Sequence, residues 1–237
     1  MHPEDTERRQ QDRLAFVGAL AGGLAHEIKN PLSTLMINLE LLAEEWASAE
    51  APREKRTLNK VRMLKKEVQR LEDIVAEFLR YARGGDLQLA PTDLSAVLSE
   101  LLDFIRPEMR QATIELREFV DEGVTATRAD AAKLKQAMLN LLINARQATA
   151  PGGSVLLRLA REAQSAVIEV TDTGCGIPAE RLPLVWQPYY STKRGGTGLG
   201  LAMTRRIIEE HGGSIEIESE VDRGTRVRVS LPLGGTS

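Results

Sequence analysis

The sequence predicts an α+β protein, in which an antiparallel hairpin of two long helices precedes a two-layer α/β sandwich. Residues 6–81 are rich in Leu, Ala, Glu, Arg and Lys and contain only two prolines, a composition that favours long helices. Gly84 and Gly85 interrupt this pattern, and beyond them short strand-like runs alternate with helical segments. We therefore expect a helical domain at residues 1–83, a linker at 84–90 and an α/β domain at 91–237.

Both predicted helices of the hairpin carry an apolar stripe. In the second helix the stripe has the alternating three- and four-residue spacing of helices that pack lengthwise: Val61, Leu64, Val68, Leu71, Val75 and Phe78. The stripe of the first helix consists of Leu24, Ile28, Leu35, Leu39, Leu42 and Trp46. Pro52 disfavours helical geometry in the residue before it, so the hairpin closes near residues 47–56. One hairpin has too narrow a seam to bury alone, and we expect a homodimer that forms a four-helix bundle.

In the C-terminal module, apolar periodicity predicts three helices, over residues 94–111, 131–149 and 199–211. Strand-like runs occupy residues 155–159, 167–171, 214–218 and 225–231. We expect the sheet on one side of this module and the helices on the other.

Charge and hydropathy exclude several classes of function. The 31 Lys and Arg against 34 Asp and Glu give a net charge of −3, without the basic field that nucleic-acid binding requires. The longest uncharged apolar stretch, residues 14–25, is shorter than the roughly 20 residues of a membrane-spanning helix. The N-terminus begins with mixed charges and resembles no signal peptide. We expect a cytoplasmic protein with no nucleic-acid partner and no membrane segment.

His26 is a candidate nucleophile on the first helix. If Leu24 and Ile28 face the bundle core, His26 lies about 200° from each around the helix and points to solvent. Asn30 returns to within roughly 40° of His26, and Glu27 is its neighbour in sequence. A neutral imidazole nitrogen attacks phosphorus, and a carboxylate holds the ring tautomer and accepts its proton. Taken alone, such a histidine is usually ordinary helix surface.

The string Leu-Ala-His-Glu-Ile-Lys-Asn-Pro-Leu at residues 24–32 closely resembles the phosphoacceptor box of the histidine kinase family. Pro31 inside the helical pattern costs about 3 kcal/mol, which suggests a local need for distortion. The resemblance implies that His26 is phosphorylated, that Glu27 is the general base, and that Asn30 positions water when a response regulator is dephosphorylated. Within the family the string is most similar to the soluble nitrogen-regulation type of sensor kinase.

Three further segments carry complementary chemistry. Asp172-Thr-Gly-Cys-Gly-Ile-Pro178 follows a predicted strand, so its carboxylate can accept a hydrogen bond from an exocyclic amine while Gly174 and Gly176 admit a planar base. Residues 195–201, Gly-Gly-Thr-Gly-Leu-Gly-Leu, open a helix whose free amides attract phosphate, without the ending of a P-loop. Asn140 and Asn144 share one face of a largely buried helix and offer amide oxygens to Mg²⁺. The first segment is also a common turn, and paired asparagines are often polar surface.

In their order along the chain, these segments resemble the Bergerat-type ATP-binding domain that histidine kinases share with gyrase, a mismatch-repair ATPase and a heat-shock chaperone. The resemblance extends over residues 91–233. The resemblance implies that Asn144 binds Mg²⁺, that Asp172 binds the adenine amine, and that Gly196, Gly198 and Gly200 form part of a lid over the phosphates. Residues 185–193 resemble the aromatic box of the family. The full set of candidate ATP-binding residues is Asn140, Asn144, Asp172, Gly174, Gly176, Tyr190, Lys193, Gly196, Thr197, Gly198, Leu199 and Gly200.

The residue four before Asn144 distinguishes among ATP chemistries. Relatives that activate water or phosphorylate serine have a glutamate there, whereas this chain has Asn140, which cannot act as a base near neutral pH. We therefore expect a protein histidine kinase of a two-component system, which autophosphorylates His26 with Mg²⁺ and ATP and transfers the phosphoryl group to an aspartate of a response-regulator receiver domain. Phosphatase activity toward that partner stays open. The alternatives are an ATPase or serine kinase of the same superfamily and a catalytically silent dimeric scaffold.

Overall fold

The computed structural model describes residues 28–48, 51–83, 87–121, 127–193 and 197–233. The chain divides into two compact units. One comprises residues 1–85 together with residues 193–197, and the other comprises residues 86–192 and 198–237. Each unit is described by itself.

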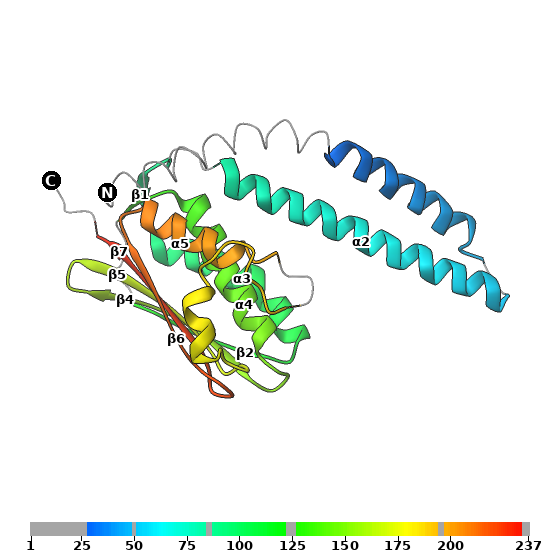
Figure 1. Cartoon of the computed structure of the whole chain (residues 1–237). Helices are drawn as coiled ribbons and strands as arrows, with labels where there is room; N and C mark the ends of the chain where they lie inside the picture. Colours follow the sequence, from blue (N-terminus) through cyan, green and yellow to red (C-terminus); the bar gives the residue numbers. More distant parts are fainter. Residues whose placement is uncertain (1–27, 49–50, 84–86, 122–126, 194–196, 234–237) are drawn as a thin grey trace. The chain divides into compact units, whose positions relative to one another are not determined.

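The helical unit is the predicted antiparallel hairpin (Figure 1). Residues 28–45 form the first helix, and α2 runs from Pro52 to Arg83. The start of α2 is capped because Glu54 Oε2 accepts a hydrogen bond from the Ala51 amide at 3.2 Å. The two helices are held together by an apolar core and by a Lys65–Glu40 ion pair of 2.8 Å. The core consists of Leu32, Leu39, Val61 and Val68, with Met36, Ala43 and Val75 packed against it.

The predicted apolar seam of α2 divides into two parallel rows. Val61, Val68 and Val75 pack inside the hairpin. Leu64 and Leu71, which alternate with them, are 56% and 43% exposed. The first helix divides in the same way, since Leu39 is buried whereas Ile28, Leu35 and Leu42 are exposed at seven-residue intervals. A single hairpin therefore uses only half of the apolar pattern that its sequence carries.

The second unit is a two-layer α/β sandwich, as predicted. Its main sheet has the order β2-β4-β5-β7-β6, with β2 parallel to β4 and the other pairs antiparallel. In chain order the strands are β2 (Glu115–Val120), β4 (Ser154–Glu162), β5 (Ser165–Asp172), β6 (Ser214–Glu220) and β7 (Gly224–Pro232). A separate antiparallel pair joins β1 (Ala90–Thr92) to β3 (Thr127–Ala129).

Three helices cover one face of the main sheet (Figure 1): α3 (Leu94–Gln111), α4 (Ala131–Ala148) and α5 (Gly200–Glu210). A 3-10 helix, η1 (Ala179–Leu184), follows the turn after β5. The helix α4 contacts α3 and α5 as well as strands β4, β5 and β7, so it lies at the centre of the helical layer. Its buried residues are Leu134, Ala137, Met138, Leu141, Leu142 and Ala145.

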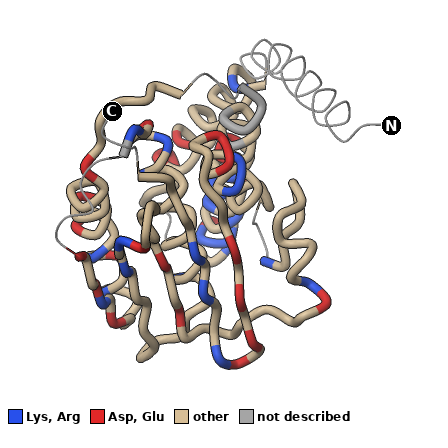
Figure 2. Tube along the Cα trace, turned by 90° about the vertical axis from the view of Figure 1, so that its left-hand side faces the viewer, with Lys and Arg blue, Asp and Glu red and all other residues tan. Residues whose placement is uncertain are grey.

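The two faces of the sheet differ as strand alternation requires. On β4, Val155, Leu157 and Leu159 are fully buried under the helices. Arg158, between them, faces the other way and pairs with Glu169 on β5 at 3.3 Å. Glu169 also pairs with Arg228 on β7 at 3.2 Å. These ion pairs identify this face as the polar one. Figure 2 shows basic and acidic residues at neighbouring positions along the strands.

The three predicted helices and the four predicted strands of this unit are all present, with ends that differ by at most a few residues. The part of the predicted first helix that precedes residue 28 lies outside the described residues. The strands β1, β2 and β3 were not predicted. Two of them have only three residues, and β2 reads Glu-Leu-Arg-Glu-Phe-Val at the edge of the sheet, where its charged residues are exposed. Within the described ranges, no helix is long and apolar enough to cross a membrane.

The burial of α4 leads to a stability prediction. Leu142 has no exposed surface, so Leu142→Ala removes packed atoms and leaves a cavity, and we expect a loss of about 2–5 kcal/mol of unfolding free energy. Phe104→Ala is the control, because Phe104 is 69% exposed and its loss should change stability by less than about 0.5 kcal/mol. Urea denaturation measures both, and equal effects of the two substitutions would contradict the central place of α4.

Candidate functional site

The predicted phosphoacceptor region is described only in part. His26 and Glu27 lie outside the described residues. Asn30 lies in the first described turn of the N-terminal helix, where its side chain is exposed. Its carbonyl oxygen accepts a hydrogen bond from Thr34 Oγ1 at 3.1 Å. Pro31 lies within the helix, as the sequence predicted.

The helix α4 presents its polar side chains in a fixed direction. Asp130 caps its N-terminus, because one carboxylate oxygen accepts a hydrogen bond from the Lys133 amide at 3.1 Å. The buried apolar residues of α4 set its rotation, which leaves Asn140 and Asn144 half-buried at its polar edge. Asn140 Nδ2 donates to the carbonyl oxygen of Gly200 at 3.4 Å. Asn140 therefore lies at the start of α5.

Asp172 lies at the end of β5 and is buried, with only 7% of its surface exposed. Its Oδ1 accepts hydrogen bonds from the Gly174 amide at 2.8 Å and from the Thr225 amide at 3.2 Å. These two bonds fix the orientation of the carboxylate. Sequence reasoning missed Gly224, which has a φ of +108° and approaches so closely that an added Cβ would lie 1.9 Å from the Asp172 carbonyl oxygen. An Asp-Arg-Gly turn between two predicted strands was the available signal.

The glycines after Asp172 have protein neighbours. A Cβ on Gly174 would lie 2.5 Å from the Ala148 carbonyl oxygen, and the adjacent Cys175 amide donates to the same oxygen at 3.1 Å. Gly176 has a φ of +68°, and a Cβ there would lie 2.0 Å from the Glu220 carbonyl oxygen. These glycines therefore let the loop approach the end of α4 and the β6–β7 turn, a constraint separate from the predicted approach of a planar base.

The glycine-rich segment before α5 is described from residue 197 onward, so Gly196 lies outside the described residues. Gly198 has a φ of +70°, and a Cβ there would lie 2.6 Å from the Tyr190 nitrogen. Tyr189, which also has a positive φ of 66°, donates its amide to the Gly198 carbonyl oxygen at 3.1 Å. The Leu199 side chain is buried and anchors the start of α5, where Leu199, as the N-cap residue, makes no side-chain capping hydrogen bond.

The remaining candidates from this segment differ in exposure. Lys193 is exposed, whereas Thr197 and Tyr190 are half-buried. Gly200, the first residue of α5, is half-buried beside Asn140.

One face of α4 joins these features. Residues 140, 144 and 148 follow one another at four-residue spacing, so they lie along one side of the helix. Asn140 contacts the start of α5, and Ala148 contacts the loop that follows Asp172. Asn144 lies between them. The fold thus brings a helix N-terminus, a fixed carboxylate and a hard amide ligand to the same part of the molecule.

This arrangement fits a magnesium nucleotide. The backbone amides at the start of α5 suit phosphate, and the amide oxygen of Asn144 suits Mg²⁺. In the parts of the chain that the structure describes, no group of three or more His, Cys, Asp or Glu side chains could hold a metal ion. In nucleotide sites Mg²⁺ usually keeps several waters and is bound in part by phosphate oxygens, so a Mg²⁺ ion beside Asn144 would need few protein ligands.

Two family models match the chain in succession. Residues 17–86 match the His Kinase A phospho-acceptor domain, and residues 129–235 match the histidine kinase-, DNA gyrase B- and HSP90-like ATPase. Among curated proteins, the sensor histidine kinase ZraS of Escherichia coli K12 is 33% identical over 230 residues, which cover 97% of this chain and 48% of that protein. Sporulation kinase C of Bacillus subtilis is 31% identical to this chain, and the matched residues cover 52% of that protein. The chain spans about half the length of these relatives.

Solved structures agree with this placement. Full-length ShkA in complex with AMPPNP has a TM-score of 0.76 at 26% identity, over 92% of this chain and 46% of that one. The histidine kinase ThkA, in complex with the response regulator TrrA, has a TM-score of 0.68 at 26% identity, over 98% of this chain and 66% of that one. The mycobacterial sensor histidine kinase MprB has a TM-score of 0.55 at 30% identity, over 61% of this chain and 97% of that one. The chain belongs to the sensor histidine kinase family, and it contains both the phospho-acceptor region and the ATPase region of the catalytic core.

Proposed function

We propose that this chain uses ATP to phosphorylate His26 and then passes the phosphoryl group to an aspartate of a response-regulator receiver domain. The observation that carries the proposal is that the start of α5 and the loop after Asp172 both contact the face of α4 that carries Asn144. The domain assignment that accompanies it places the acceptor in residues 1–83 and the nucleotide site in residues 91–237.

In the proposed complex, Asp172 accepts a hydrogen bond from the exocyclic amine of adenine. Its side chain is suited to this role because two backbone amides already fix its orientation, so little entropy is lost on binding. Amides at the start of α5, in the segment that contains Gly198, Leu199 and Gly200, bind the phosphates. Asn144 would hold Mg²⁺, which neutralises phosphate charge during transfer.

The base for the reaction comes from the acceptor segment. No carboxylate occurs on α4 between Asn140 and Ala148, and Asn140 uses its amide to contact Gly200. The nucleotide unit therefore offers no base on this face to activate water. His26 attacks the γ-phosphorus through an imidazole nitrogen, so that an N–P bond forms, the bond from phosphorus to the ADP oxygen breaks, and Glu27 accepts the imidazole proton.

Transfer to a partner follows on the same surface of the hairpin. ThkA was solved with a response regulator, which supports a receiver domain as the partner of the present chain. Asn30, four residues after His26 in the sequence, is exposed, so a docked receiver domain could reach it. There it would position water when the phosphorylated partner is hydrolysed.

A homodimer completes the hairpin. Ile28, Leu35 and Leu42 on the first helix and Leu64 and Leu71 on α2 are exposed at seven-residue spacing, parallel to the buried rows. Sets of this spacing on both helices of a hairpin pack against a second hairpin. We propose that two chains join along these rows as a four-helix bundle.

The acceptor assignment has a direct test. Incubation with γ-labelled ATP and Mg²⁺ should label the unmodified chain, and the label should be acid-labile and alkali-stable, as expected for phosphohistidine. His26→Gln should reduce labelling to background because the nucleophilic nitrogen is lost. His2→Gln, at another of the three histidines of the chain, should label normally. Label that survives His26→Gln would refute the mechanism.

The nucleotide assignment is tested at Asp172. Asp172→Asn keeps an oxygen for the Gly174 and Thr225 amides but loses the charge that strengthens the bond to adenine, so the Kd for ATP should rise about ten- to hundredfold. Asp222→Asn, at an exposed turn residue with a positive φ, is the matched control. Titration with a fluorescent ATP analogue measures both, and unchanged affinity of Asp172→Asn would remove this residue from the site.

The dimer is tested on α2. Leu64→Glu and Leu71→Glu place charge on the proposed interface. Light scattering after gel filtration should then show the mass of one chain instead of the mass of two. Met63→Glu is the control, since Met63 is 71% exposed and lies on the side of α2 away from the hairpin core. A chain that remains dimeric with both leucines replaced would contradict the proposed rows.

A further inference from the structure

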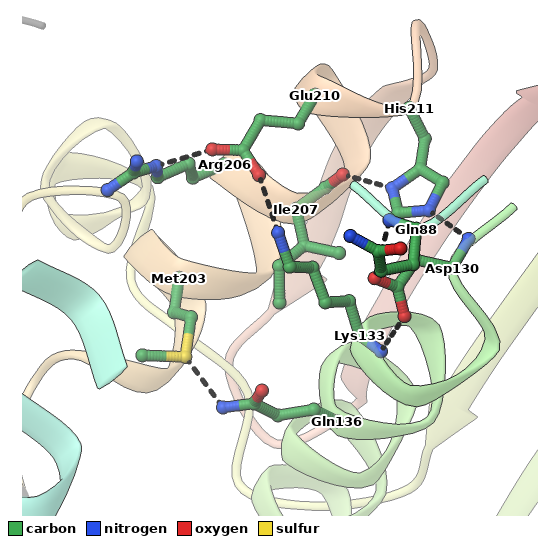
Figure 3. A network of polar contacts seen from close by, with 9 residues as sticks. All are labelled: Gln88, Asp130, Lys133, Gln136, Met203, Arg206, Ile207, Glu210 and His211. Atoms are coloured by element: carbon green, nitrogen blue, oxygen red, sulfur yellow. Dashed lines mark hydrogen bonds and ion pairs between the residues drawn. The ribbon is translucent and has the colours of Figure 1, made fainter. Parts of the chain in front are cut away.

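The helices α4 and α5 pack antiparallel, and polar contacts join them along their length (Figure 3). At one end His211 contacts Asp130, and Lys133 Nζ lies 3.8 Å from Glu210 Oε2. Further along, Gln136 Nε2 lies 2.9 Å from Met203 Sδ. At the other end Asn140 contacts Gly200, as described above. The position of α5 along α4 is therefore set at both ends.

His211 is held in a single tautomer at the C-terminal cap of α5. Its Nδ1 lies 2.7 Å from the Ile207 carbonyl oxygen, and because a carbonyl only accepts, Nδ1 carries the proton. The Nε2 atom then has a lone pair, and it accepts a hydrogen bond from the Asp130 amide at 3.0 Å. The residue is buried, so loss of this bond would leave the Asp130 amide without its partner.

Asp130 connects three segments of the unit. Besides the Lys133 amide at the start of α4, its carboxylate accepts the Gln88 amide at 3.1 Å. Burial raises the pKa of Asp130, but these amides and the Lys133 charge lower it, and the net pKa lies below its ordinary value. Gln88 lies just before β1, in the chain that arrives from the helical unit. One residue thus joins that chain, the start of α4 and the end of α5.

We propose that His211 and Asp130 form a positioning junction, which holds α5 in register on α4 and so places the first turn of α5 beside Asn140 for phosphate binding. This inference rests on the proposed nucleotide function. The helix α5 has 11 residues and is about 16 Å long, so it transmits a displacement at His211 to Gly200 as a nearly rigid rod. Because Gln88 shares the Asp130 carboxylate, the register also depends on where the arriving chain enters the unit.

A junction of this kind has a different kinetic signature from a contact that only stabilises the fold. Loss of stability lowers the fraction of folded protein, which reduces the apparent kcat and leaves the KM for ATP unchanged. A change in the register of α5 alters the phosphate-binding amides in every folded molecule. It therefore raises the Kd and the KM for ATP.

Three substitutions at His211 separate its two contacts. His211→Leu removes both, and His211→Asn retains a donor near Ile207 but cannot reach Asp130. His211→Gln places an amide oxygen near the former Nε2 and can accept from the Asp130 amide. In the full chain we expect the Leu and Asn variants to raise the Kd for a fluorescent ATP analogue, and the KM for ATP in autophosphorylation, about fivefold. The Gln variant should remain within about twofold of the unmodified chain.

Glu209→Gln is the matched control, because Glu209 is an exposed residue of the same turn that pairs with Arg205 and does not face α4. It should leave the Kd and the KM unchanged. If the Leu and Asn variants lower the melting temperature but bind ATP as the unmodified chain does, the junction has no positioning role. If the Leu variant does not fold, equal Kd values of the Asn and Gln variants would overturn the proposal. Absence of nucleotide binding by the unmodified chain would overturn the proposed function and this inference together.

Discussion

The burial of α4 is the constraint on which the rest of the α/β unit depends. Its apolar residues pack between the sheet and the neighbouring helices, and each large side chain contributes about 1.5–3 kcal/mol when fully buried. That packing fixes the rotation of the helix about its axis. Asn140, Asn144 and Ala148 are therefore held in one line, and the loop after Asp172 and the start of α5 both attach to that line.

The two units divide the chemistry in the proposed reaction. The α/β unit offers a fixed carboxylate, an amide ligand and helix amides, to which the proposal assigns nucleotide binding and not removal of the proton from the nucleophile. The proposed nucleophile and base are His26 and Glu27, which are neighbours in sequence and belong to the phospho-acceptor region. The helical unit also carries an exposed apolar row on each helix, so the same hairpin is suited both to present the acceptor and to join a second chain.

Much of the fold was predictable because its helices and its central strands have long, regular apolar patterns. The helix at residues 94–111 was predicted with the bounds that the structure shows. The strand β2 was missed because its exposed edge position allows Glu115, Arg117 and Glu118, which mask the alternation of a buried strand. The division of the α2 seam was also not predictable, since Val61 and Leu64 are equally apolar and only packing against the first helix separates them.

The sequence by itself determined which residues are chemically able to act, because His26 with Glu27, the two asparagines of α4 and the Asp172 segment are local patterns. Only the tertiary structure decided how they are held. The Asp130 amide and His211 are 81 residues apart in the chain, and Asp172 and Thr225 are 53 apart. No local pattern records such pairs, because a backbone amide looks the same in every sequence, and its partner is chosen by the packing of helices and strands around it.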